Sequence, residues 1–134
     1  YLREDGIIML YRFAHKTGVY VVKIVEEGSD QCLVQVLQVI KHPKQGDLHH
    51  PNEVEGVFFH ERKALSLYEK RYTPQSRLKP FDGEVEDYTV TLQRAITNLE
   101  TQLNELDTAY AHASLDCLTR LKTDYSRQYK INFV

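Results

Sequence analysis

Histidine and carboxylate side chains gather in one stretch of this sequence. The segment from His42 to Glu61 reads HPKQGDLHHPNEVEGVFFHE and holds four of the six histidines of the chain. Its acidic residues are Asp47, Glu53, Glu55 and Glu61. Imidazole and carboxylate groups are ligands for zinc and iron, and they also act as general acids and bases. This histidine-rich segment (residues 42–61) is therefore the first place to look for chemistry.

A metal site is one interpretation of the segment. The side chains that could hold a metal or a small ligand are His42, Asp47, His49, His50 and His60. His49 and His50 are adjacent, however, so their side chains diverge on an extended chain. The HExxH arrangement needs a helix to place two histidines on one face, and nothing between Pro43 and Pro51 indicates a helix. We therefore expect no metal and no cofactor, and we keep a metal- or small-ligand-binding protein as the alternative function.

Enzymatic chemistry is not indicated by the other candidate residues. Ser66 and Ser76 lack the flanking glycines of a nucleophile elbow, and the sequence has no glycine-rich phosphate loop and no Walker lysine. His112 lies in a helix-like run, but Ala113 follows it where a phosphoacceptor box carries an acidic residue. We therefore expect a protein that is not an enzyme.

The turn-forming residues of the segment favour a recognition loop. Pro43, Gly46, Pro51, Asn52 and Gly56 interrupt regular structure, and an irregular stretch of about 15 residues in a compact domain is usually functional or disordered. Arginine and aromatic side chains are common at interface hot spots. The residues that we predict to bind a protein partner are His42, Asp47, His49, His50, Phe59, His60 and Arg62.

The sequence before residue 80 has the pattern of β-strands. Runs rich in valine, isoleucine and tyrosine are separated by turn residues. The predicted strands are Met9–His15, Val19–Glu27, Cys32–Ile40, Gly56–Glu61 and Ala64–Arg71. Five short strands with tight turns favour a small barrel, because closure removes exposed sheet edges. Phe58 and Phe59 are neighbours on one predicted strand, so one of them must leave the core and contact the helices or a partner.

The sequence after residue 84 changes to a helical period. Apolar residues recur at intervals of three and four, and the polar run Asn104–Asp107 divides them into two stripes. This pattern predicts an antiparallel helical hairpin packed on the barrel. The predicted organisation is a barrel over residues 1–80, the hairpin over residues 84–128 and a tail over residues 129–134. The tail ends in apolar residues and should form a short strand or dock on the barrel.

Composition narrows the class of partner. The 134 residues carry a net charge of −2, which argues against nucleic-acid binding and leaves an RNA-associated barrel as a weaker hypothesis. Cys32 and Cys117 are far apart and match no redox or zinc motif, which predicts two buried thiols in a reducing compartment. No run approaches the roughly 18 apolar residues of a membrane span, and no cysteine near the start offers a lipidation site.

Four segments together resemble the kinase-associated protein B family of Bacillus-type spore-forming bacteria. They are KTG with Tyr20 (from Lys16), HPKQGDLHHPN (42–52), FFHERKAL (58–65) and KPFDGEVEDY (79–88). The resemblance covers nearly the whole chain, from about Tyr11 to Tyr125, and the second and third segments are its most distinctive part.

The resemblance implies an α+β protein, mainly β, with an SH3-like small β-barrel followed by a C-terminal helical hairpin. It also implies a non-enzymatic accessory protein that assists a sensor histidine kinase feeding the sporulation phosphorelay, without a cofactor. On this basis we expect protein–protein binding in the cytoplasm, with peripheral association at the inner face of the membrane through the kinase. The oligomeric state stays open, with a dimer among the options.

Overall fold

The structure is a computed structural model that describes residues 8–47 and 49–133. Five strands form one antiparallel sheet in the order β4-β3-β2-β1-β5. Their bounds are Leu10–His15 for β1, Gly18–Glu27 for β2, Cys32–Lys41 for β3, Lys70–Thr73 for β4 and Lys79–Phe81 for β5. A 3₁₀ helix (Gln75–Arg77) joins β4 to β5.

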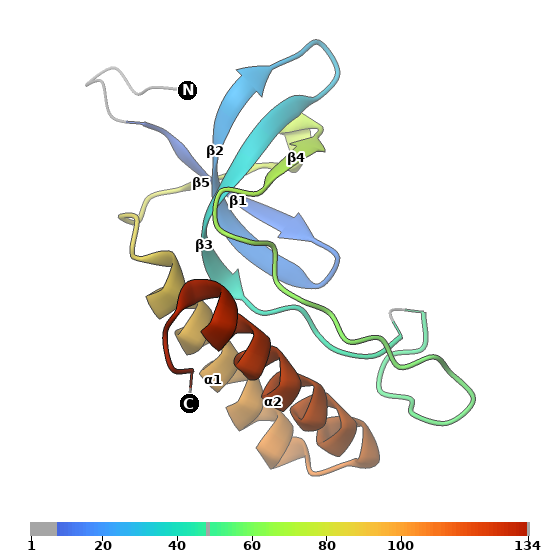
Figure 1. Cartoon of the computed structure of the whole chain (residues 1–134). Helices are drawn as coiled ribbons and strands as arrows, with labels where there is room; N and C mark the ends of the chain where they lie inside the picture. The colour runs from blue at the N-terminus through green and yellow to red at the C-terminus, as the bar shows by residue number, and fades with distance from the viewer. Residues whose placement is uncertain (1–7, 48, 134) are drawn as a thin grey trace.

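The short connection between β4 and β5 requires the sheet to curl. These two strands lie at opposite edges of the sheet, which in a flat sheet would be about 19 Å apart. Only residues 74–78 connect them, and the 3₁₀ helix shortens their reach to less than that of an extended chain. The strongly bent sheet in Figure 1 brings the two edges toward each other, as in an SH3-like barrel.

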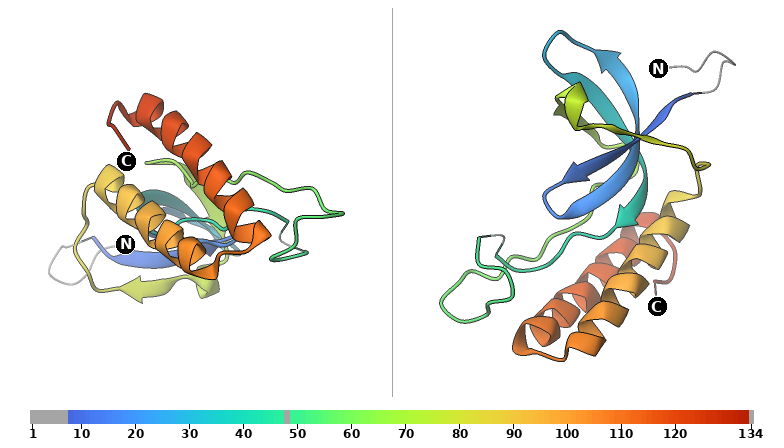
Figure 2. Two further views of the ribbon diagram at one scale, coloured as in Figure 1. Left: turned by 90° about the horizontal axis from the view of Figure 1, so that it is seen from below. Right: turned by 180° about the vertical axis from the view of Figure 1, so that it is seen from behind.

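The two helices form an antiparallel hairpin beside the C-terminal end of β3 (Figures 1 and 2). Helix α1 spans Tyr88–Leu106 and α2 spans Ala109–Tyr129. Asp87 caps α1 by accepting hydrogen bonds from the Thr89 and Val90 amides, and Thr108 caps α2 through the Ala111 amide. The prediction of an α+β protein, mainly β, with an SH3-like barrel and a C-terminal helical hairpin is confirmed.

One hydrophobic core joins the barrel to the hairpin. Side chains alternate between inside and outside along β2 and β3, which places Val22, Ile24, Val34 and Val36 in the interior. The apolar stripe of the hairpin, from Leu92 onward, belongs to the same cluster of buried residues. The barrel and the hairpin therefore pack as one unit.

One predicted strand, Gly56–Glu61, is absent, and another, Ala64–Arg71, is formed only at its last two residues. Residues 56–61 and 64–69 have no strand structure, and β4 begins only at Lys70. In residues 64–67, tyrosine hydroxyls take the place of a neighbouring strand as hydrogen-bond acceptors: Ala64 donates to Tyr125, Leu65 to Tyr20 and Leu67 to Tyr129. Backbone pairing with β3 begins at Tyr68, whose amide donates to the Val36 carbonyl. The sheet is completed instead by β5, which contains Pro80 and runs one residue past the predicted end of the barrel.

The C-terminal tail docks rather than forming a strand. Helix α2 continues to Tyr129, and Phe133 then folds back against the core with its ring centroid 5.8 Å from that of Tyr125. The Phe133 amide donates a hydrogen bond to the Ser126 hydroxyl over 3.0 Å. Cys32 and Cys117 are free and buried, as predicted. No helix within residues 8–47 and 49–133 is long and apolar enough to cross a membrane.

Candidate functional site

The histidine-rich segment lies in a long loop between β3 and β4, the β3–β4 loop (residues 42–69). Figure 1 shows the loop running along α2 and then extending beyond the hairpin. Its two arms meet at a base, where the Gly46 amide donates a hydrogen bond to the His60 carbonyl over 2.8 Å. Residues 47 and 49–59 beyond this point are called the loop tip.

Gln45 fastens the loop base. Its side chain is 3% exposed, and its amide oxygen accepts a hydrogen bond from the Arg62 amide over 2.7 Å. Its amide nitrogen donates to the carbonyls of Pro43 and Arg62, each over 3.0 Å. The Gln45 carbonyl in turn accepts a hydrogen bond from the Tyr110 hydroxyl of α2. The buried side-chain amide of Gln45 therefore supplies hydrogen bonds between the two arms that paired strands would otherwise supply.

His42 is a structural residue rather than an accessible one. Its side chain is 3% exposed, with Nδ1 2.9 Å from the Pro43 carbonyl and Nε2 2.8 Å from the Tyr125 hydroxyl. Burial lowers the pKa of His42 to about 4, so the ring is neutral at pH 7. The neutral ring donates from Nδ1 to the carbonyl and accepts at Nε2 from Tyr125. His42, which was predicted to contact a partner, is therefore buried inside the free protein and holds the loop.

Asp47 organises the start of the loop tip. One carboxylate oxygen accepts a hydrogen bond from the His49 amide over 2.8 Å, and the other lies 3.2 Å from Nδ1 of His50. The His49 amide, with a smaller contribution from His50, holds the pKa of Asp47 below its ordinary value. Asp47 thus stays ionised and fixes a turn, and both histidines are exposed beside it.

Phe58 and Phe59 face different surroundings, as adjacent residues were expected to do. Phe59 is partly buried against α2, with its ring centroid 5.9 Å from that of Tyr110. Phe58 is 72% exposed and lies against His60, with 4.4 Å between the ring centroids. Of the two phenylalanines, only Phe59 was included in the predicted binding set. Phe58 is the side chain that a partner could cover.

Arg62 belongs to the loop base. It is partly buried, and one terminal nitrogen donates a hydrogen bond to the Gly46 carbonyl over 3.1 Å. The predicted set is therefore divided: His49, His50 and His60 are exposed on the loop, whereas His42, Phe59 and Arg62 help to hold it. Gln45, Tyr110 and Tyr125, which fasten the loop, were not predicted.

The structure does not gather the side chains that the metal-site alternative requires. Within residues 8–47 and 49–133, no three His, Cys, Asp or Glu side chains stand close enough together to hold a metal ion. Both ring nitrogens of His42 are already engaged in hydrogen bonds. No observation on the described residues therefore favours a metal or cofactor site here.

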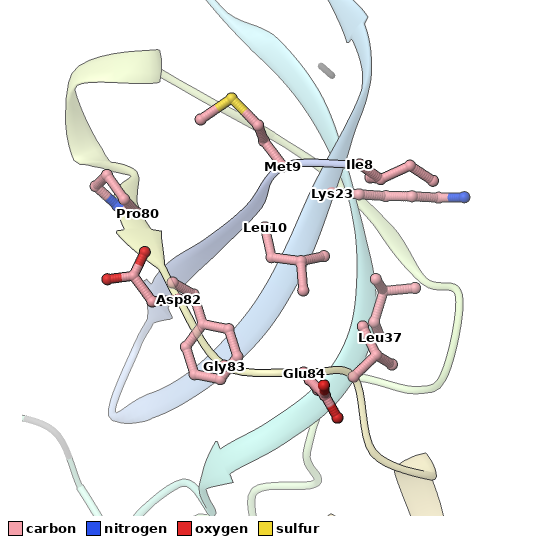
Figure 3. Close-up of a pocket in the computed structure, with 11 residues that line it drawn as sticks. Ile8, Met9, Leu10, Lys23, Leu37, Pro80, Asp82, Gly83 and Glu84 are labelled. Carbon is pink, nitrogen blue, oxygen red and sulfur yellow. The ribbon is translucent and has the colours of Figure 1, made fainter. Parts of the chain in front are cut away.

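A largely apolar pocket of about 640 Å³, with Lys23, Asp82 and Glu84 also in its lining, lies beside β1, β3 and β5 (Figure 3). Leu10 of β1 and Leu37 of β3 line it together with Pro80 of β5 and the linker that leads to α1. Leu37 follows the core residue Val36, so its side chain points to the opposite face of the sheet. The predicted domain boundary falls in this linker, and no pocket was predicted there.

The family model for kinase associated protein B matches residues 15–126. The chain is 44% identical over 111 residues to kinase-associated lipoprotein B of Bacillus subtilis strain 168, covering 83% of this chain and 87% of that relative. It also resembles the crystal structure of kinase-associated protein B from Bacillus cereus, with a TM-score of 0.72 and 30% identity. That match covers 88% of this chain and 94% of the other. The fold, the matched family model and the curated relative together identify this chain as a member of the kinase-associated protein B family.

Proposed function

We propose that this protein is a non-enzymatic accessory protein that binds a sensor histidine kinase and favours its active state in the phosphorelay that starts sporulation. The relatives are named for association with a kinase, which supports a kinase as the partner. The observation that carries the proposal is the loop tip. It exposes Phe58, His49 and His50, next to the exposed His60, on a loop whose base is fastened by buried hydrogen bonds.

A fastened base matters because ordering a loop on binding costs free energy. The hydrogen bond from Gln45 to the Arg62 carbonyl joins the two arms, and the hydrogen bond between His42 and Tyr125 holds the first arm on α2, before any partner binds. Phe58 can therefore be covered by a partner without the cost of fixing the whole loop. A large exposed aromatic residue of this kind is a common centre of an interface hot spot.

An accessory protein acts on a kinase by binding one of its conformational states more tightly than another. A tenfold change in the ratio of active to inactive kinase requires about 1.4 kcal/mol of differential binding free energy. Covering one exposed phenylalanine supplies about 1.5–3 kcal/mol. The Phe58 contact is therefore large enough for this role, provided that it forms in only one state of the kinase. We place the protein in the cytoplasm, at the inner face of the membrane when it is bound to the kinase.

The direct test measures binding of the cytoplasmic portion of the kinase and its rate of autophosphorylation. We expect Phe58→Ala and His49→Ala to weaken binding, with at least a tenfold loss for Phe58→Ala. Val90→Ala is the matched control, because Val90 is 51% exposed on α1, outside the loop. Equal binding of the Phe58, His49 and control variants would remove the loop tip from the mechanism. Binding without any change in autophosphorylation would contradict the activating role.

A further inference from the structure

A second pocket, of about 230 Å³, lies between the β1–β2 turn, β4 and the base of the β3–β4 loop. Its lining includes four cationic side chains and one carboxylate, that of Glu61. The cations come from three separate segments: Lys16 from the turn, Arg71 from β4, and Arg62 and Lys63 from the loop. We call this the basic pocket.

Most of this positive charge is not neutralised locally. The Glu61 carboxylate is engaged by Arg120 of α2 over 2.8 Å, and Arg71 is paired with Glu69 over 2.6 Å. Within the described part of the chain, no carboxylate forms a salt bridge with Lys16, Arg62 or Lys63. Lys16, Arg62 and Lys63 therefore line one small cavity without a carboxylate partner among the described residues. Arg62 also donates to the Gly46 carbonyl, and the Lys63 ammonium lies 5.5 Å from the ring centroid of Tyr125.

One buried donor beside the pocket has no partner among the described residues, and a second group, the Tyr20 hydroxyl, keeps a proton to donate. The Nε atom of Arg62 is buried and has no hydrogen-bond partner among the described residues. Tyr20, which is 1% exposed and lines the pocket, accepts a hydrogen bond from the Leu65 amide, but within residues 8–47 and 49–133 its own hydroxyl proton has no acceptor. Burial raises the pKa of Tyr20 to about 12, so this proton stays in place at pH 7. Buried donors without acceptors are rare in folded proteins and indicate a missing partner.

We propose that the basic pocket binds a phosphate group. A phosphate group carries between one and two negative charges at pH 7 and presents acceptor oxygens on several sides. Arginine, lysine and tyrosine donors that converge from three segments suit such a group better than a planar carboxylate. The phosphate can be inorganic phosphate or a phosphorylated side chain of a partner protein. This inference does not depend on the proposed kinase partner.

His15 provides a probe inside the pocket. Burial, together with the nearby charges of Arg71 and Lys16, lowers its pKa, and Glu69 opposes this effect weakly. A bound phosphate should raise the pKa of His15, because an opposite charge favours the imidazolium ion. The probe needs no mutation, so a folding defect cannot obscure it.

The test titrates inorganic phosphate into the wild-type chain at constant ionic strength, followed by NMR. We expect one site with millimolar affinity, shifts in the amides that line the basic pocket and a raised His15 pKa. The double variant Lys16→Asn, Lys63→Gln should lose at least tenfold in affinity; asparagine suits the left-handed backbone of Lys16 at φ 53°. The control Lys23→Gln, Lys79→Gln removes the same charge away from the pocket and should bind within twofold of wild type.

Two further arms identify the ligand. N-acetyl-O-phosphoserine that binds more tightly than inorganic phosphate would assign the site to a phosphorylated side chain, whereas the reverse order would assign it to free phosphate. Acetate that binds as tightly as phosphate would overturn the proposal. So would an unchanged His15 pKa, or equal losses in the double variant and the control, since these results would mean that phosphate acts only through general charge.

Discussion

The Nε2 atom of His42 lies 2.8 Å from the hydroxyl oxygen of Tyr125, so a hydrogen bond joins the first residue after β3 to the last part of α2 across 83 positions of sequence. The same hydroxyl accepts a hydrogen bond from the Ala64 amide over 2.8 Å. One oxygen atom therefore ties both arms of the β3–β4 loop to the helical hairpin.

Replacing Tyr125 by phenylalanine should lower the free energy of unfolding by about 2 kcal/mol or more. The change removes one oxygen and leaves the Ala64 amide and His42 Nε2 buried without partners. Tyr129→Phe is the comparison variant, because the Tyr129 hydroxyl accepts a longer backbone hydrogen bond, of 3.4 Å, from the Leu67 amide. Denaturant unfolding at pH 7.5 measures both variants. Equal losses would mean that the Tyr125 hydroxyl has no special role.

The stability of the protein should fall as the pH decreases from about 6.5 to about 4. The folded-state pKa of His42 is about 4 and the unfolded value is 6.5, so the unfolded chain binds the proton first. The contribution of neutral His42 is therefore complete above pH 6.5 and is lost as the pH falls toward 4. It amounts to about 3 kcal/mol.

Unfolding curves measured between pH 7.5 and 4 check this dependence. The variant His42→Gln removes the titrating group, so its stability should vary less with pH over the same range. Carboxylates with lowered pKa values, such as Asp47 and Asp87, lose their contributions at more acidic pH in both proteins. If wild type and His42→Gln show the same slope above pH 5, then His42 is not the group responsible.

Gln45→Leu should open the loop base and expose the tip to proteolysis. The change removes three hydrogen bonds to backbone groups of Pro43 and Arg62, each worth about 1 kcal/mol. A glutamate-specific protease can then cleave after Glu53 or Glu55, and we expect the cleavage rate to rise at least tenfold. Gln35→Leu, which removes one exposed hydrogen bond to the Tyr68 carbonyl, is the control. Similar cleavage of both variants would contradict the role of Gln45.

Sequence periodicity predicted well the strands and helices whose apolar residues recur at a regular interval. The three long strands and both helices were predicted within a few residues, because alternation and a 3.6-residue period report burial directly. Residues 56–61 also have strand-forming composition, but they have no strand to pair with. Tertiary partners, and not local preference, decide whether such a segment becomes a strand.

The candidate site could be predicted only in part for a similar reason. The location of the loop followed from its prolines, glycines and histidines. The roles of its residues did not, because the burial of His42 depends on Tyr125 and that of Gln45 on Arg62 and Tyr110, which lie far away in sequence. The basic pocket assembles from three segments, and no spacing in the sequence indicates that they meet.

Thr91 connects α1 to the sheet, and its replacement by valine should lower the free energy of unfolding by about 1–3 kcal/mol. The Thr91 hydroxyl accepts a hydrogen bond from the Val39 amide of β3 over 3.1 Å, next to an irregularity in the pairing of β3 with β2. Both residues are buried, so the valine variant keeps the shape but leaves the amide without an acceptor.

Thr101→Val is the matched control, because Thr101 is exposed on the same helix and its hydroxyl donates to the Thr97 carbonyl within that helix. Its effect should stay within about 0.5 kcal/mol. Hydrogen exchange adds a local measurement: the Val39 amide should lose protection in Thr91→Val and keep it in Thr101→Val. Unchanged protection of Val39 would show that this hydrogen bond does not hold α1 on the sheet, and the packing of Leu92 and Ile96 would then have to do so alone.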